Sequence, residues 1–278
     1  MGRPPLPVGE GIRIVAVVPC LDEAPSVGRV VETLRAQPLL SRIVVVDNGS
    51  TDGTGDIARA AGADVVREER RGYGYACKAG VLAAHDADVV VLLDGDAADD
   101  PADLPRILDP LLAGRAELVV GSRALGSREP GSMTPQQLVG NKVAAWLMRG
   151  IYGVRVTDLG PFRCIRRCDL LALDMQEMTY GWSVEMMVKA ARAGYRYHEV
   201  PVRYMRRIGV SKVGGTFSGS VKAGWCILST TLKYSRWTPP SRVRRSDRSG
   251  EARPTRAAGA SAPDPHDGRD PSSLRSSG

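Results

Sequence analysis

The sequence lacks paired cysteines and long apolar runs, and both absences narrow the class of protein. Its five cysteines are odd in number and form no CxxC pair, and Cys164 and Cys168 have no histidine nearby. A zinc site is therefore not expected, and reduced thiols in a cytoplasmic protein are the better interpretation. No apolar run approaches the ~20 residues that a membrane-spanning helix needs. The short N-terminal arm carries no secretory signal.

A nucleic-acid partner is not indicated either, although the formal net charge is +7. The segment 236–278 holds nine arginines and five acidic residues, which leaves +4 there and only +3 on everything before it. Its composition, rich in Arg, Ser, Pro, Gly and Ala with few apolar residues, predicts a disordered basic tail. No nucleic-acid-binding module is visible in the rest of the chain. The sequence does not indicate an oligomeric state.

What the first half does contain is an alternation of apolar runs and amphipathic segments. Short apolar runs at 12–18, 42–46 and 89–93 alternate with stretches of helical spacing such as 104–111. Strands that alternate with helices predict a Rossmann-like, mostly parallel sheet with helices on both faces. The expected fold class is therefore α/β, and ligands are expected at the carboxyl ends of the strands.

Acidic residues gather at those strand ends. Asp94-Gly95-Asp96 follows the apolar run 89–93, and Asp47 follows the run before it. A divalent cation bound to a diphosphate takes one or two protein carboxylates and leaves its other positions for phosphate and water. Asp94 and Asp96 are therefore candidate metal ligands, with a solvated, helix-capping acidic turn as the alternative.

Six motifs follow one another along the chain: 17–23, IVVVDNGSTDGT at 43–54, 92–96, Gly121-Ser122-Arg123, DLGPFR at 158–163 and RRIGVSK at 206–212. Together they resemble the motifs of family-2 glycosyltransferases with the GT-A (nucleotide-diphospho-sugar transferase) fold. The dolichol-phosphate mannosyltransferase-like, polyprenyl-phosphate glycosyltransferase branch is the most similar. The likeness covers about 12–235. It implies one GT-A domain, with a nucleotide-binding half at 12–100 and an acceptor half at 101–235.

The resemblance also implies roles for individual residues. Asp94 and Asp96 would be catalytic and would hold Mg²⁺ or Mn²⁺, with Asp96 as the main ligand. Arg163 and Ser211 would belong to the acceptor side. The donor, a UDP- or GDP-hexose, would be bound by Pro19, Leu21, Glu23, Val45, Asp47, Asp94, Gly95, Asp96, Arg123, Arg206 and Lys212.

Three positions depart from the family pattern. Leu21 stands where the family often has an aromatic residue, so base stacking is lost and the choice of base stays open. Asn48 stands where Asp is frequent, and Ala98 replaces a Gln of the mannosyltransferases. The glycines of the run Gly72-Tyr73-Gly74 do not have dinucleotide-binding spacing, and we expect them to let the backbone pass close to the donor.

The implied reaction is inverting, metal-dependent transfer of a hexose, and two acceptor classes stay open. A lipid acceptor, polyprenyl phosphate, is favoured by the intact basic loop and by an amphipathic helix after it, which would allow peripheral contact with the cytoplasmic face of the membrane. The apolar stripe of that helix is Phe217, Val221, Trp225, Leu228 and Leu232.

The alternative acceptor, a soluble hydroxyl, would need a base, for which Glu185 is the candidate. An ion pair between Glu185 and Arg163, or simple placement at a helix N-terminus, is the competing interpretation of that residue. From another class, a nucleotidyltransferase or a non-catalytic nucleotide-sugar-binding protein is the remaining hypothesis. The first strand end lacks the basic glycine-rich loop that a nucleotidyltransferase should carry.

Overall fold

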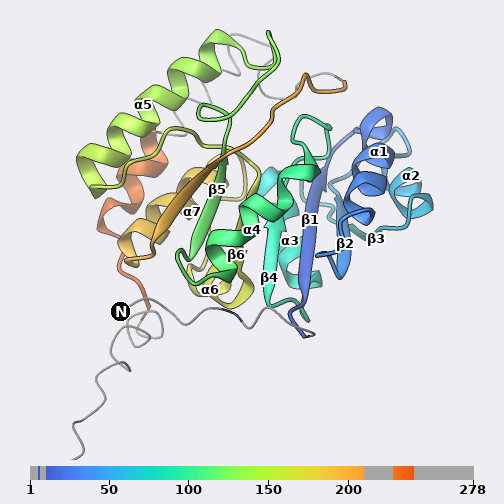
Figure 1. Cartoon of the computed structure of the whole chain (residues 1–278), viewed down its shortest axis with the longest axis horizontal. Helices are drawn as coiled ribbons and strands as arrows, with labels where there is room; N and C mark the ends of the chain where they lie inside the picture. Colours follow the sequence, from blue (N-terminus) through green and yellow to red (C-terminus); the bar gives the residue numbers. More distant parts are fainter. Residues whose placement is uncertain (1–5, 7–10, 210–227, 241–278) are drawn as a thin grey trace, which may run out of the picture.

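A seven-stranded sheet forms the centre of the computed structural model, which describes Leu6 and residues 11–209 and 228–240 (Figure 1). The order of the strands across the sheet is β3-β2-β1-β4-β6-β5-β7. The first four strands in the chain form one side of the sheet. The strands are β1 (Ile14–Cys20), β2 (Arg42–Asp47), β3 (Asp64–Arg67), β4 (Val89–Leu92), β5 (Leu118–Ser122), β6 (Arg163–Arg166) and β7 (Tyr197–Pro201).

Most of the strands run parallel, which confirms the expected α/β class. β1 pairs in parallel with both β2 and β4, and β7 pairs in parallel with β5. Only β6 among the described strands is antiparallel, to β4 on one side and to β5 on the other. A four-residue strand such as Arg-Cys-Ile-Arg has the same pattern in both directions, so periodicity does not reveal this reversal.

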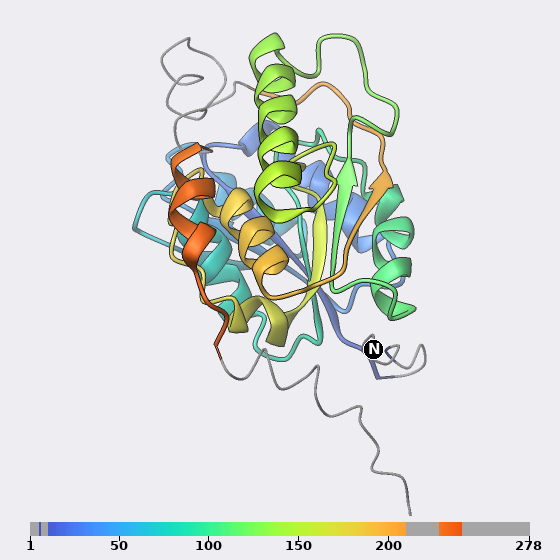
Figure 2. The same cartoon turned by 90° about the vertical axis from the view of Figure 1, so that its left-hand side faces the viewer.

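Helices cover both faces of the sheet (Figures 1 and 2). Successive residues of β1 contribute to opposite faces: Val15 and Val17 join one apolar core, and Ala16 joins the other. The first core is completed by α3 (Tyr73–Ala83), α5 (Pro135–Tyr152), α6 (Arg167–Ala172) and α7 (Trp182–Arg192). The second is completed by α1 (Ala24–Arg35), α2 (Thr54–Ala60) and α4 (Leu104–Leu112), and a short 3-10 turn, η1 (Pro101–Asp103), precedes α4.

The C-terminal part of the described chain packs against α7. Residues 228–233 are helical and lead into the turn η2 (Tyr234–Arg236). The Lys189 ammonium lies 4.7 Å from the ring centre of Tyr234, and Arg192 Nε donates a 3.1 Å hydrogen bond to the carbonyl of Trp237. Packing therefore extends past the boundary at 235 that the composition suggested. The remaining expected tail, 241–278, lies outside the described residues.

Within 11–209 and 228–240, no helix combines the length and the apolar character that crossing a bilayer requires. Of the expected amphipathic stripe, Phe217, Val221 and Trp225 lie outside the described residues, whereas Leu228 and Leu232 are exposed.

Candidate active site

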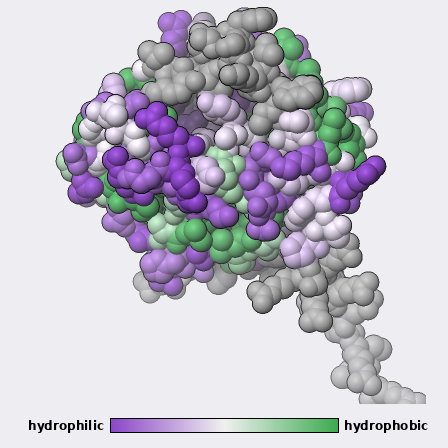
Figure 3. Space-filling view, turned by 180° about the vertical axis from the view of Figure 1, so that it is seen from behind, coloured by the Kyte–Doolittle hydropathy of each residue, from purple (hydrophilic) through white to green (hydrophobic). Residues whose placement is uncertain are grey.

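A cavity of about 400 Å³ opens where β1 and β4 end, on the face of the sheet that α3 covers. Figure 3 views the molecule from this side and shows a hollow in its surface near the upper centre. The walls come from segments that are far apart in the sequence. The lining residues are Pro19, Cys20, Leu21, Glu23, Asn48, Arg71, Gly72, Tyr73, Ala76, Asp94, Gly95, Asp96, Thr179, Tyr180 and Arg207.

The turn after β4 brings both carboxylates of Asp94 and Asp96 to this cavity. The Tyr73 hydroxyl donates a 3.1 Å hydrogen bond to Asp94 Oδ1, and the backbone N–H of Ala98 donates a 3.0 Å bond to Asp96 Oδ1. Ala97, the residue after Asp96, has φ 59°, a left-handed conformation that costs an alanine about 1–2 kcal/mol. Backbone strain of this kind persists only where the surroundings hold the turn in place.

Gly95 is required by the packing of the same turn. A Cβ atom on this residue would overlap Sγ of Cys20, the last residue of β1. A glycine therefore lets the turn lie directly on the neighbouring strand end. Ser26 at the start of α1 donates a 2.8 Å hydrogen bond to the Gly95 carbonyl and ties the turn to that helix. The turn Asp94-Gly95-Asp96, which we call the DxD turn, is thus held by the end of β1 and the start of α1.

The carboxylates at this turn repel one another. Burial, and after it the like charge of Asp96, raise the pKa of Asp94 to about 7. Asp99 is buried, neither of its oxygens has a hydrogen-bond partner among the described residues, and its pKa is raised well above the ordinary range by burial and then by Asp94. The opposing positive charge comes from Arg207, whose guanidinium lies 3.4 Å from Asp96 Oδ2 and 3.1 Å from Glu23 Oε1.

This arrangement fits a divalent cation that is held jointly with a diphosphate. Asp94 and Asp96 supply two acidic oxygen donors on one wall, and a bound cation would relieve their repulsion. Within the described parts of the chain, no group of three or more His, Cys, Asp or Glu side chains is placed to enclose an ion. The donor set is therefore that of a cation that keeps positions free for phosphate and water rather than of a closed protein cage.

Six of the expected donor-site residues meet at the cavity, and several others do not. Asp47 does not line the cavity, and its carboxylate accepts hydrogen bonds from Ser50 N at 2.7 Å and Arg67 Nη1 at 3.2 Å. Val45, on β2, is fully buried in the apolar core of the protein and does not line the cavity either. Those that line the cavity are Pro19, Leu21, Glu23, Asp94, Gly95 and Asp96.

The cations expected to bind the donor, Arg123, Arg206 and Lys212, do not line the cavity where the structure describes them. Arg123 is buried and makes a bidentate pair with Asp158, through Nε at 2.6 Å and Nη2 at 2.7 Å. Arg206 Nε donates to the carbonyl of Pro130 at 2.8 Å, and neither arginine is in the cavity wall. Lys212 and Ser211 lie outside the described residues.

Glu185 and Arg163 are both in the interior, which corrects their expected roles. The Glu185 side chain is 0% exposed, pairs with Lys189 Nζ at 2.7 Å, and accepts backbone hydrogen bonds from Gln176 and Glu177. A carboxylate enclosed in this way cannot reach an acceptor hydroxyl. Arg163, expected on the acceptor side, is 1% exposed and donates to backbone carbonyls of Ser183, Leu159 and Gly160.

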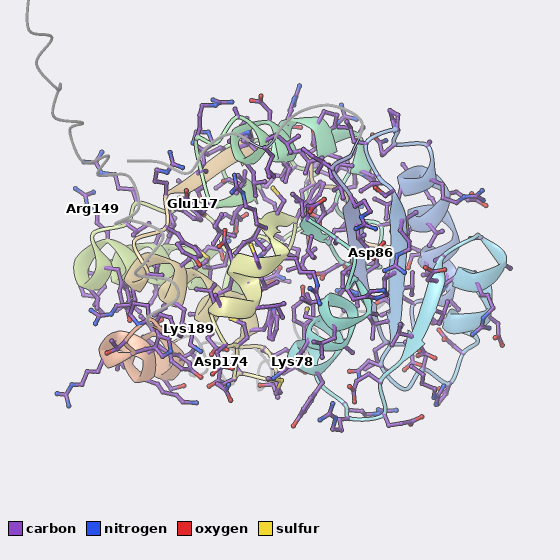
Figure 4. All side chains as sticks on the ribbon, turned by 90° about the horizontal axis from the view of Figure 1, so that it is seen from below. Lys78, Asp86, Glu117, Arg149, Asp174 and Lys189 are labelled. Atoms are coloured by element: carbon purple, nitrogen blue, oxygen red, sulfur yellow. The ribbon has the colours of Figure 1, made fainter. Side chains whose placement is uncertain are left out.

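Lys189 explains why Glu185 is buried without Arg163. Besides forming the ion pair, the Lys189 ammonium donates a 2.6 Å hydrogen bond to the Asp174 carbonyl. Figure 4 shows Lys189 and Asp174 close together. The pair Glu185–Lys189 therefore fastens α7 to the segment 174–177. That segment leads directly into Thr179 and Tyr180 at the cavity.

The glycine-rich run packs closely on a neighbouring segment. Added Cβ atoms at Gly72 and Gly74 would collide with the backbone of Met178 and Glu177, and Gly74 N donates to Met178 O at 3.0 Å. The glycines thus admit the 177–178 segment, and Gly72 also lines the cavity. Tyr73 between them is the residue that reaches the DxD turn.

Several cavity residues were not anticipated. Arg207 is adjacent to the expected Arg206, and two neighbouring arginines in an irregular segment cannot be ranked by periodicity. Asn48 holds the cavity rim through its amide: its Nδ2 donates to the carbonyls of Glu68 and Arg70, and its Oδ1 accepts from Gly72 N. Nothing in the sequence around Tyr180 signals a place in the cavity.

Comparison with known proteins shows the family to which this chain belongs. The model of the family described as Glycosyl transferase family 2 matches residues 15–171. An uncharacterised glycosyltransferase of Mycobacterium tuberculosis is 40% identical over 225 residues, which are 79% of this chain and 99% of that protein. An undecaprenyl-phosphate mannosyltransferase of Micrococcus luteus is 32% identical over 225 residues, 75% of this chain and 90% of the relative.

A solved structure shares the fold. Glucosyl-3-phosphoglycerate synthase from Mycobacterium tuberculosis, crystallised with Mn²⁺, uridine diphosphate and phosphoglyceric acid, superposes with a TM-score of 0.65 at 23% identity, covering 86% of each chain. The chain therefore belongs to glycosyl transferase family 2 and has the GT-A fold. It is a glycosyltransferase, and the Micrococcus luteus relative carries a name from the polyprenyl-phosphate branch that the motifs of this chain resemble.

Proposed function

We propose that this enzyme transfers a hexose, with inversion, from a UDP- or GDP-sugar to a polyprenyl phosphate, assisted by Mg²⁺ or Mn²⁺. The observation that carries the proposal is the 400 Å³ cavity at the ends of β1 and β4 with Asp94 and Asp96 on its wall. A cavity of this size accommodates a nucleotide-sized ligand. The structural relative that binds Mn²⁺ and uridine diphosphate supports a metal and a nucleotide donor.

The residues of the cavity have separate tasks in this proposal. Asp94 and Asp96 would hold the cation, and a bound cation would neutralise charge on the leaving diphosphate. Arg207, already at the carboxylates, would contribute a second positive charge to the same diphosphate. Pro19, Leu21 and Asn48 would form the wall beside the nucleoside, where the base lies against aliphatic surface instead of an aromatic ring.

A phosphate acceptor fits the interior placement of Glu185. An acceptor phosphate is already anionic, so its oxygen attacks the anomeric carbon without a protein base, whereas a hydroxyl acceptor needs one. The residue considered for that base is 0% exposed. The name of the Micrococcus luteus relative, undecaprenyl-phosphate mannosyltransferase, points to the same acceptor class. We place the enzyme on the cytoplasmic face of the membrane, at its surface.

The test is a donor screen. The full chain would be incubated with UDP- and GDP-hexoses and Mn²⁺, each with a short-chain polyprenyl phosphate, the matching polyprenol without phosphate, or 3-phosphoglycerate. We expect a glycosyl polyprenyl phosphate whose anomeric configuration is opposite to that of the donor, and no product with EDTA. Transfer to the unphosphorylated polyprenol or to 3-phosphoglycerate alone would refute the acceptor assignment, and retention of configuration would refute inversion.

A further inference from the structure

Helix α5 is well defined at both ends but hardly buried. Thr134 and Gln137 form a reciprocal capping box at its N-terminus, and Gly153, with φ 68°, ends it in a left-handed cap. Of its 18 residues only Ala144 and Met148 are buried. A helix in water is usually stabilised by packing an apolar face, so a capped helix with so little burial has a face available for a partner.

The exposed face of α5 is apolar. Val139, Val143 and Trp146 follow one another at helical spacings of four and three residues, and their exposed fractions are 60%, 40% and 73%. Ile151, near the end of the helix, is 42% exposed. In Figure 3, where α5 lies toward the right-hand edge, hydrophobic residues are visible on the surface there. Ile151 is turned away from these three residues, so we call the set Val139, Val143 and Trp146 the α5 face.

The charges around the α5 face have one sign. Residues 130–157 contain no Asp or Glu, and they contain Lys142, Arg149 and Arg155. Lys142 and Arg149 are exposed on α5 itself, and Figure 4 shows Arg149 at the outer edge of the molecule. Valine and tryptophan flanked by cations, without acids, form the pattern of a helix lying in an anionic membrane interface. A protein partner would have to be acidic as well as apolar to match it.

The α5 face is also connected to the active site. Asn141 on α5 donates a hydrogen bond from Nδ2 to Asp158, which in turn holds Arg123 in its bidentate pair. The Arg123 guanidinium lies 4.9 Å from the ring centre of Tyr204, and the next residue, Met205, donates a 2.8 Å hydrogen bond from its backbone N–H to the Ala98 carbonyl, two residues after Asp96. Tyr152, at the other end of α5, donates to the Thr231 carbonyl, so residues 228–233 lie against this helix, as Figure 2 also shows.

We propose that the α5 face docks the enzyme on an anionic lipid surface, with Trp146 and Val143 in the interface and Lys142 and Arg149 at the headgroups. This inference rests on the proposed lipid-phosphate acceptor, because docking would bring the acceptor phosphate to the DxD turn while its chain stays in the bilayer. It assigns membrane contact to α5, independently of the amphipathic stripe after the basic loop.

The experiment is vesicle sedimentation with the purified full chain. The vesicles would contain phosphatidylcholine with phosphatidylglycerol, or phosphatidylcholine alone. We expect Val143→Ser with Trp146→Ser to lower binding to the anionic vesicles at least about tenfold. Lys142→Gln and Arg149→Gln should each lower it by about fivefold, and raised salt should reduce the effect of these two. All four positions are exposed, so circular dichroism and the thermal midpoint should stay at the parent values.

Matched controls come from α3, where Lys78 and Leu82 are also exposed. Lys78→Gln and Leu82→Ser should leave vesicle binding unchanged. Equal binding by the α5 variants and the parent protein would overturn the proposal. A change of oligomeric state in the α5 variants, measured by size-exclusion chromatography with light scattering, would also overturn it by showing that α5 contacts a second copy.

A second readout separates this proposal from the proposed function. Transfer to a short-chain polyprenyl phosphate in detergent should be the same in the α5 variants and the parent protein. If no polyprenyl phosphate is an acceptor but the α5 variants still lose vesicle binding, the acceptor assignment fails and the docking surface stands. If transfer occurs and vesicle binding does not depend on α5, the docking surface fails alone.

Discussion

Arg207 Nη1 lies 3.4 Å from Asp96 Oδ2, so the cavity holds an ion pair at the position where a cation and a diphosphate would meet. Arg207 also binds Glu23, and its side chain is 31% exposed. The guanidinium partly offsets the repulsion among the carboxylates of the DxD turn. It is therefore placed to oppose the binding of a free cation and to favour the binding of a diphosphate.

Substitution of Arg207 should separate these two effects. In Arg207→Ala, Mn²⁺ alone should bind about fivefold more tightly, equal to about 1 kcal/mol for one partly solvated charge nearby. The nucleoside diphosphate, measured with saturating Mn²⁺, should bind more weakly. Titration calorimetry of both ligands checks the opposite signs. Arg206→Ala is the control, because Arg206 donates to Pro130 instead of lining the cavity. Weaker Mn²⁺ binding in Arg207→Ala would contradict the assignment.

Asp96→Asn should reduce sugar transfer by about 10²–10³-fold, the size of effect seen when a group that stabilises developing charge is removed. The asparagine Oδ1 can still accept the hydrogen bond from Ala98 N, so the turn and the thermal midpoint should be retained. Asp56→Asn on α2, where the side chain is 88% exposed, is the matched control. Full activity in Asp96→Asn, or undiminished activity of the parent protein in EDTA, would show that this carboxylate holds no essential metal.

Glu185→Gln should destabilise the fold instead of altering the chemistry. Breaking a fully buried ion pair leaves the Lys189 charge uncompensated, which typically costs about 3–5 kcal/mol. Urea denaturation measures this loss, and the double variant Glu185→Gln with Lys189→Met should regain part of it. Turnover per folded molecule should keep the parent pH profile. Loss of the basic limb of that profile at unchanged stability would instead identify Glu185 as a base.

The Arg123–Asp158 pair should make stability depend on acid pH. Burial alone would raise the pKa of Asp158, but the hydrogen bonds and charge of Arg123 outweigh it and hold the pKa below its ordinary value. The contribution of Asp158 to the free energy of unfolding is therefore complete above about pH 4 and is lost as the pH falls through the lower folded-state pKa.

Urea denaturation between about pH 5 and pH 2 checks this dependence. Asp158→Asn should be less stable near neutral pH, because Arg123 stays buried without its partner, and its free energy of unfolding should fall less steeply in acid. Asp109→Asn, which removes the exposed partner of Arg115, should keep the parent slope. An equal slope in Asp158→Asn and the parent protein would mean that this pair is not linked to the acid transition.

Local sequence patterns were enough to predict the edge of the sheet at which the cavity opens. β2, expected at 42–46, is Arg42–Asp47, and the turn 94–96 follows β4 as the apolar run 89–93 indicated. Local periodicity specifies strands and their ends, and parallel strands bring their carboxyl ends to one edge. Formation of the sheet therefore brings together at one cavity the side chains of Pro19, Glu23, Asp94 and Asp96.

Which side chains turn toward that edge depends on packing between different parts of the chain. Arg207 rather than Arg206 reaches the carboxylates because Ile208 N binds the Asp96 carbonyl at 2.9 Å and Arg206 N binds Glu129 at 2.8 Å. Glu185 takes Lys189 as its partner because α7 packs on the segment 174–177. The choice of Arg207 depends on contacts between segments far apart in the sequence, such as Arg206 with Glu129. The partner of Glu185 is only four residues away, but its selection depends on how α7 packs. A local pattern of charges and apolar residues does not reveal which partner the packing selects.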